Sequence, residues 1–196
     1  IPDGYPTYYS PQGRIEGPSV TKMRMEDTWW ARCIKEINGN LLLNNSWSGS
    51  TIGYKGYCGD CSQTSSFICR YRTLKMQAFF ERNNVDTILV FGGTNDSWVG
   101  ATLGELKYSD CKEDELFQVL PAIFHFLSNL KIDLPKTEII VIINSGIKKE
   151  IQDGLENVSK YFGLKYVRLE NIDKECGHPT EKGMQQISEQ VLEVLI

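Results

Sequence analysis

The sequence has 196 residues, 41% of them hydrophobic and 23% charged, which fits a single globular domain over residues 1–196 with a substantial core. A formal net charge of −4, with no cluster of Lys and Arg, excludes an electrostatic footprint for nucleic acid or an anionic membrane. The apolar runs are also far shorter than the roughly 20 residues of a membrane-spanning helix, so we expect a small-molecule partner, no nucleic acid and no membrane.

The N-terminal residues 1–24 are rich in Pro, Gly and Tyr and lack periodicity, which predicts an irregular arm. The sequence starts at Ile1, without an initiator Met or a signal region. We therefore expect a processed, truncated or incompletely represented polypeptide. A signal segment before Ile1 would make the protein secreted or periplasmic, whereas the printed residues indicate no compartment.

Regular structure is expected to begin near Met25, with a helix that ends at Gly39. The apolar face of this helix has helical spacing and consists of Trp29, Trp30, Cys33, Ile34 and Ile37. Leu41–Leu43 then predicts a short buried strand that ends in small polar residues. A second helix is expected from about Ser65 to Arg82, and Thr87–Phe91 predicts a buried strand.

The second half of the chain continues the alternation of strands and helices. A helix is expected from about Lys112 to Leu130, interrupted or kinked at Pro121. The later elements are predicted as strands at Ile139–Ile143 and Tyr166–Leu169 and helices at Lys148–Phe162 and Thr180–Leu195. This alternation predicts an α/β domain with three layers, a mostly parallel sheet and right-handed crossovers.

The six cysteines are irregularly spaced in a chain too long to need a disulfide framework. Cys58 and Cys61 form a CxxC, but no second CxxC or His pair completes a zinc-ligand set. A loop disulfide or inert thiols are favoured over metal or redox chemistry, and we expect no cofactor and no metal.

Polar residues follow the predicted strands where a ligand would bind. Asn95 and Asp96 come after the Thr87–Phe91 strand, and Gly49 lies in the loop after Leu41–Leu43. In an open α/β sheet the carboxyl ends of the strands border the ligand crevice. Gly49 offers an unobstructed backbone N–H and Asn95 a side-chain amide, which together would form an oxyanion hole. The alternative for Asn95 and Asp96 is a helix cap or turn.

A base and an acid lie close together near the C-terminus. His178 stands in a loop before a helix capped by Thr180, and Asp173 and Glu175 precede it. A carboxylate that holds the Nδ1 proton would turn Nε2 toward a nucleophile. A structural role for this loop histidine is the alternative.

These residues resemble the motifs of the SGNH (GDSL-type) hydrolases, which are esterases and lipases on a flavodoxin-like fold. Residues 93–96 (GTND) resemble the block whose Asn, here Asn95, donates to the oxyanion, and residues 45–50 (NSWSGS) resemble the block whose glycine, here Gly49, is the second donor. Residues 173–179 (DKECGHP) resemble the block with the acid and the catalytic His178. The resemblance covers nearly the whole chain and implies a three-layer α/β/α flavodoxin-like fold.

Two departures from this family pattern concern the acid and the nucleophile. The usual family spacing selects Glu175 as the acid, whereas the spacing of some branches selects Asp173, which we prefer. The GDS block, whose Ser is the nucleophile at the end of the central strand, is missing. The resemblance implies that this strand and its Ser precede Ile1, with Ser46 or Ser48 as the less favoured substitute.

Loss of a central strand would expose unpaired backbone groups inside the sheet. Three explanations are open on the sequence alone. The real polypeptide contains the missing strand, another segment or subunit fills the gap, or the sheet closes over it.

We expect a serine ester hydrolase that acts through an acyl-enzyme and deacylates a carbohydrate or small ester, with Trp47 and Trp98 as candidates to stack on a sugar. The alternative is a catalytically inactive module on the same fold that binds a glycan or acyl ester. A nucleotide-binding domain is weaker because no GxGxxG or P-loop follows a strand, and the oligomeric state is open.

Overall fold

The computed structural model describes residues 23–196, so the predicted arm at 1–24 lies almost wholly outside the described residues. The elements are η2 (Met25–Asp27), α1 (Trp29–Glu36), β1 (Lys55–Gly56), β2 (Gly59–Asp60), α2 (Phe67–Met76), α3 (Phe79–Arg82), β3 (Thr87–Gly92), α4 (Thr94–Trp98), η3 (Glu113–Phe117), α5 (Val119–Asp133), β4 (Glu138–Ile143), α6 (Lys149–Phe162), β5 (Lys165–Arg168), β6 (Lys174–Glu175), β7 (His178–Pro179) and α7 (Glu181–Leu195).

The main sheet is parallel and has the strand order β3-β4-β5. Its register pairs Thr87 with Glu138 at one end of β3 and Gly92 with Ile143 at the other. All residues of β4 after Glu138 are buried, because helices cover the sheet on both faces and leave no polar side of the strand. The strand predicted at Ile139–Ile143 is thus confirmed, and the structure places it in the middle of the described sheet.

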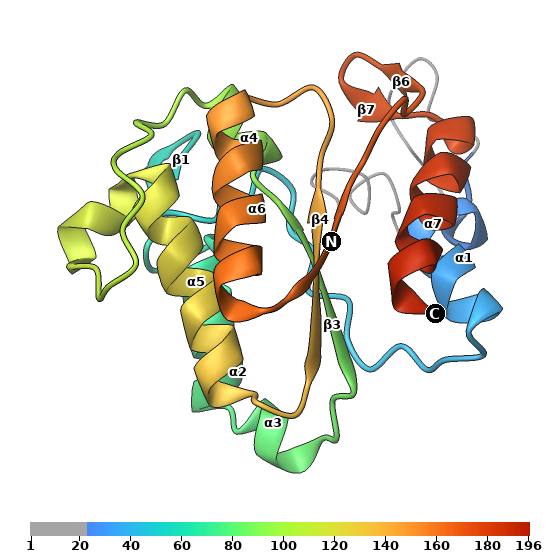
Figure 1. Ribbon diagram of the computed structural model, residues 1–196, viewed down its shortest axis with the longest axis horizontal. Helices are drawn as coiled ribbons and strands as arrows, with labels where there is room; N and C mark the ends of the chain where they lie inside the picture. The colour runs from blue at the N-terminus through green and yellow to red at the C-terminus, as the bar shows by residue number, and fades with distance from the viewer. Residues whose placement is uncertain (1–22) are drawn as a thin grey trace.

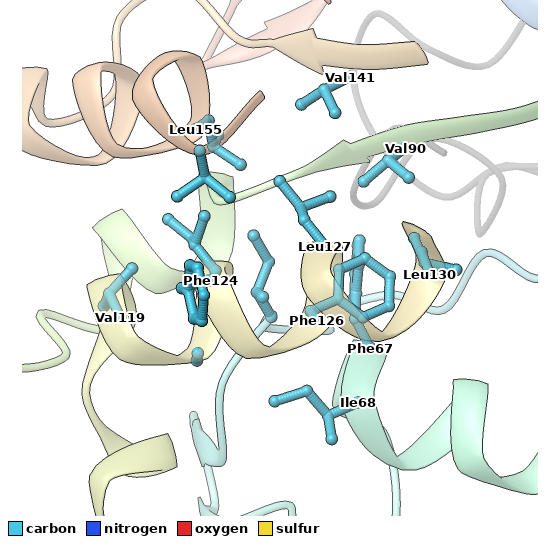
Figure 2. Close-up of a cluster of buried hydrophobic side chains, with 14 of the residues drawn as sticks. Phe67, Ile68, Val90, Val119, Phe124, Phe126, Leu127, Leu130, Val141 and Leu155 are labelled. Atoms are coloured by element: carbon cyan, nitrogen blue, oxygen red, sulfur yellow. The ribbon is translucent and has the colours of Figure 1, made fainter. Parts of the chain in front are cut away.

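Helices form one layer on each face of this sheet, as Figure 1 shows. Helices α2, α5 and α6 pack with Val90, Val141 and their neighbours into one core, part of which is drawn in Figure 2. Helices α1 and α7 pack against Phe91 and Ile142 on the opposite face. The domain thus has the three-layer α/β/α fold expected from the alternation of elements.

Two predicted helices differ in detail from the observed ones. The helix expected over Ser65–Arg82 is divided into α2 and α3, because Ala78 between them has a left-handed backbone with φ 51°. The helix expected from about Lys112 to Leu130 is interrupted, but at Gln118 between η3 and α5 and not at Pro121. Pro121 is the third residue of α5, and in the first turn its missing N–H removes no intrahelical hydrogen bond.

The strand predicted at Leu41–Leu43 is not formed, and its burial was also wrong. The three leucines are 49%, 52% and 43% exposed, and the segment has no strand structure. A strand needs a neighbour to bond with its backbone, and within residues 23–196 no strand pairs with the outer edge of β3. The segment therefore remains irregular.

A mostly apolar groove of about 680 Å3 lies between this outer edge of β3 and residues 41–45. Its other walls come from α1, α2, α3 and part of α5. Trp29 and Trp30 line it, and the indole N–H of each is buried without a hydrogen-bond partner among the described residues. We call this space the β3 groove.

Candidate active site

The carboxyl end of β3 leads directly into the short helix α4, which begins with Thr94, Asn95 and Asp96. All three side chains are buried. Gly93 makes the sharp turn with φ 93°, and a Cβ there would stand 3.0 Å from Ile151, so both backbone conformation and space favour glycine. The strand thus delivers three adjacent polar side chains into the protein.

Asp96 binds the loop that follows Ser50. Its carboxylate accepts hydrogen bonds from the backbone N–H of Ile52 at 3.1 and 3.0 Å and from that of Gly53 at 3.3 Å. Burial raises the pKa of Asp96 to about 6, against the lowering effect of these N–H groups. Asp96 therefore acts as the anchor of residues 50–53.

Asn95 points to the same loop and lies beside Gly49. Its Nδ2 donates to the carbonyl of Ser50 at 2.9 Å, and its Oδ1 accepts from the hydroxyl of Tyr57 at 3.1 Å. Gly49, next to Ser50, has φ 71°, and a Cβ there would lie 3.5 Å from the Tyr57 ring. The two predicted oxyanion donors are therefore brought together at the end of β3.

His178 lies in a hairpin formed by β6 and β7, rather than in the plain loop that was predicted. Cys176 and Gly177 form its turn with φ 49° and 82°, as a two-residue turn with left-handed residues requires. Trp98, at the end of α4, contacts the His178 ring edge-to-face with 5.4 Å between ring centroids. Burial lowers the pKa of His178, so the neutral imidazole that a general base requires is favoured at pH 7.

Both candidate acids share a face of the hairpin with His178. Glu175 is the cross-strand partner of His178, and Asp173 stands two residues before Glu175, on the same face of the strand. The Asp173 carboxylate accepts the hydroxyl hydrogen bond of Thr180, and no hydrogen bond joins Asp173 to His178 in the described chain. The predicted acid is therefore near the base but bonded to the cap of α7.

A polar network connects the hairpin with α4. Lys174 donates to Asn144 Oδ1 at 2.9 Å and to the carbonyl of Ser145, and Asn144 donates in turn to Thr94 at 2.8 Å. Burial lowers the pKa of Lys174. Sequence analysis missed Lys174, Asn144 and Tyr57. Asn144 directly follows a predicted strand, which is the one signal that could have revealed it.

The serines considered as substitute nucleophiles lie in the loop before Gly49. Ser46 donates its hydroxyl to Asn44 Oδ1, and its N–H bonds the same oxygen at 3.1 Å. Ser48 is exposed. Between them, Trp47 is 61% exposed. The loop is thus an Asx-type turn that presents an aromatic ring to solvent.

All six cysteines are free thiols, and the described part of the chain holds no group of three or more His, Cys, Asp or Glu side chains placed to bind a metal. Among the described helices, none is long and apolar enough to cross a membrane.

Comparison with known proteins places the chain among hydrolases. The family model for GDSL-like lipase/acylhydrolase matches residues 1–195. A Bacteroides ovatus protein named as a GDSL-like lipase is 34% identical with a TM-score of 0.84, covering 98% of this chain and 94% of its own. A Bacteroides uniformis protein named likewise is 38% identical with a TM-score of 0.82, covering 97% and 91%.

A more distant structure shares the fold. An acetyl xylan esterase from the rumen bacterium Butyrivibrio proteoclasticus is 20% identical with a TM-score of 0.59, covering 88% of this chain and 55% of its own. The comparison with curated proteins finds no match.

Proposed function

The chain belongs to the GDSL-like lipase/acylhydrolase family and is a hydrolase of ester bonds, and from this premise we propose that it is a serine hydrolase that deacylates a carbohydrate or similar small ester through an acyl-enzyme. The observation that carries the proposal is the meeting of Asn95 and Gly49 at the end of β3, next to the α4 helix whose Trp98 contacts His178.

Apart from the nucleophilic serine, each group that the reaction needs has a residue in this arrangement. His178 takes the proton of a serine hydroxyl, and the serine oxygen attacks the ester carbonyl. The resulting oxyanion is held by the backbone N–H of Gly49 and the Nδ2 of Asn95. His178 then protonates the leaving alcohol, and water releases the acyl group by the same route. Asp173 is our choice for the acid that orients His178, with Glu175 as the alternative.

The nucleophile is proposed to come from a segment that precedes Ile1. Helices on one face of a parallel sheet connect strands in one direction when their crossovers are right-handed. Helix α2 connects residues 41–43 to β3 and packs on the same face as α5 and α6. Its crossover therefore runs in the same direction as theirs, and residues 41–43 lie beyond the outer edge of β3. Helix α1 leads into residues 41–43 and packs on the opposite face, so its crossover runs in the opposite direction. The strand that precedes α1 therefore belongs between residues 41–43 and β3.

The β3 groove lies at this position. It is mostly apolar, as the surroundings of a central parallel strand are, and its lining extends from residues 84–86 along the first part of β3 to Val90 and includes Asn44 and Asn45. If the segment before Ile1 forms a strand in this groove, parallel to β3, that strand would end beside the oxyanion donors and bring its serine there.

A carbohydrate ester is favoured by the aromatic side chains near the site. Trp47 and Trp98 are 61% and 42% exposed, and flat aromatic faces suit the apolar face of a sugar ring. The acetyl xylan esterase among the structural neighbours fits this substrate class. Acetyl is the acyl group that we propose.

Intact mass spectrometry before and after treatment with a fluorophosphonate tests the nucleophile. One adduct on a polypeptide heavier than 22.3 kDa is expected, because the reactive serine would then precede Ile1. An adduct on the 22.3 kDa chain itself would transfer the role to a serine such as Ser46 or Ser48. Absence of any adduct, together with binding of a glycan or acyl ester, would identify a non-catalytic binding module instead.

A further inference from the structure

Tyr57 contacts both residues to which we assign the oxyanion. Its hydroxyl donates to Asn95 Oδ1 at 3.1 Å, and its ring lies 3.5 Å from the position that a Gly49 Cβ would occupy. Although 58% of its surface is exposed, the side chain is thus directed across the site and not simply into solvent.

The hairpin that carries Tyr57 is fixed to the rest of the domain. Strands β1 and β2 pair Gly56 with Gly59, which leaves Tyr57 and Cys58 as the turn residues. The backbone N–H of Cys61 donates to the carbonyl of Tyr54 at 2.8 Å, and the N–H of Tyr54 donates to the carbonyl of Leu116 at 2.8 Å. The ring is therefore presented from an anchored turn.

The direction of the Asn95 amide decides whether it stabilises or repels an oxyanion. An amide has a donor nitrogen and an acceptor oxygen of similar size, and a rotation by half a turn would direct Oδ1 at the negative charge. The Tyr57 hydroxyl donates to Oδ1, and the Ser50 carbonyl accepts from Nδ2. Both bonds favour the same orientation, with Nδ2 toward the Ser50 carbonyl, which directly follows Gly49.

We propose that Tyr57 is a positioning residue that fixes the Asn95 amide and supports the Gly49 turn for oxyanion binding. This inference rests on the proposed ester hydrolysis. Tyr57 acts through Asn95 and Gly49, and it takes no part in proton transfer.

The variant Tyr57→Phe tests the hydroxyl, because the ring against Gly49 is retained. We expect kcat toward p-nitrophenyl acetate to fall about 3- to 10-fold, the value of one hydrogen bond, with KM changed less than twofold. Tyr57→Ala removes ring and hydroxyl and should cost more. Tyr108→Phe is the matched control, since Tyr108 is also an exposed tyrosine but packs on Tyr161. Equal kcat for Tyr57→Phe and Tyr108→Phe would overturn the proposal.

A second measurement does not depend on turnover. The side-chain 15N–1H signals of Asn95 should shift and exchange faster with solvent in Tyr57→Phe than in wild type or Tyr108→Phe. Unchanged Asn95 signals would overturn the positioning role even if kcat fell. If a polypeptide that includes the segment before Ile1 has no esterase activity but its Asn95 signals respond to Tyr57→Phe, the proposed function is refuted and the Tyr57 contact remains the device that orients this amide.

Discussion

Asn95 and Asp96 are neighbours in the sequence, but their side chains have different tasks. Asn95 borders the candidate oxyanion site through Ser50 and Tyr57, whereas the Asp96 carboxylate is fully enclosed and bonds backbone N–H groups of residues 52 and 53. Sequence analysis placed both at the site of chemistry, and the structure assigns the second a scaffold role. A buried carboxylate of this kind has a consequence for stability at different pH values.

The pKa of Asp96 predicts that the protein loses stability as pH rises from about 4 to about 6. Burial raises this pKa from 3.8 to about 6, so the folded state holds the proton more tightly than the unfolded state does. The contribution is complete below pH 3.8 and lost above the folded pKa. Two pKa units correspond to about 3 kcal/mol. Asp96→Asn retains an acceptor for the N–H groups and cannot ionise.

Urea unfolding at pH 4, 5, 6 and 7 measures this contribution. The free energy of unfolding of wild type, relative to Asp96→Asn, should decrease over this range by up to about 3 kcal/mol. Parallel pH profiles for the two proteins would show that Asp96 titrates normally.

Trp98 is expected to control the pKa of His178. Its ring contacts the imidazole, and burial is the cause that lowers the pKa of His178. Trp98→Ala admits water to the imidazole, so this pKa should rise toward its ordinary value and the acid limb of kcat/KM should move to higher pH. Trp47→Ala serves as the control, because the two tryptophans differ in this histidine contact. An acid limb at the same pH in wild type and Trp98→Ala would contradict the prediction.

Among the elements, the β6–β7 hairpin pairs His178 with Glu175, and Asp173 directly precedes β6. We expect Asp173→Asn to lower kcat about a hundredfold or more, because an amide no longer stabilises the imidazolium form of His178. Glu175→Gln should leave kcat within a few-fold of wild type. Measured kcat values with p-nitrophenyl acetate decide between the two, and the reverse order would assign the acid to Glu175.

The elements that the sequence predicted best are those whose pattern depends on local burial. The apolar runs of β3 and β4 and the amphipathic pattern of α6 and α7 led to nearly correct bounds. Leu41–Leu43 has the same apolar character as a buried strand but lacks a neighbour, which no local pattern reveals. The break at Ala78 was also missed, since alanine is a helix-favouring residue that here adopts φ 51°.

The candidate site was predictable to the extent that its residues follow strands or match a family motif. Asn95, Gly49 and His178 were proposed in this way. Tyr57 and Lys174 were not, because their contacts join segments that lie about 40 and 30 residues apart in the chain. Side chains from separate loops meet only once the sheet has brought those loops together.

At the scale of the whole molecule, the outer edge of β3 pairs with no strand among residues 23–196. Asp86 directs its carbonyl to the N–H of Glu138, and since backbone groups alternate along a strand, Thr87, Leu89 and Phe91 direct their N–H groups toward the β3 groove. In the 196-residue chain we expect these three amides to exchange hydrogen faster than those of Ile88 and Val90, which face β4.

Hydrogen exchange resolved by residue measures this difference. In a polypeptide that includes the segment before Ile1, the amides of Thr87, Leu89 and Phe91 should become as slow as those of Ile88 and Val90, because a new strand bonds them. Equal protection already present in the 196-residue chain would mean that another segment covers the edge, and our assignment of the groove would fail.

Helix α4 also matters to anyone who would redesign this protein. It makes three connections to two loops: Thr94 bonds Asn144 in one loop, whereas Asn95 bonds Ser50 and Asp96 bonds the backbone at Ile52 in the other. A library that randomises this helix would alter stability and turnover together, and the two effects could not be selected separately. Variation for new ester specificities is better confined to exposed positions such as Trp47, where a change of side chain leaves these three connections intact.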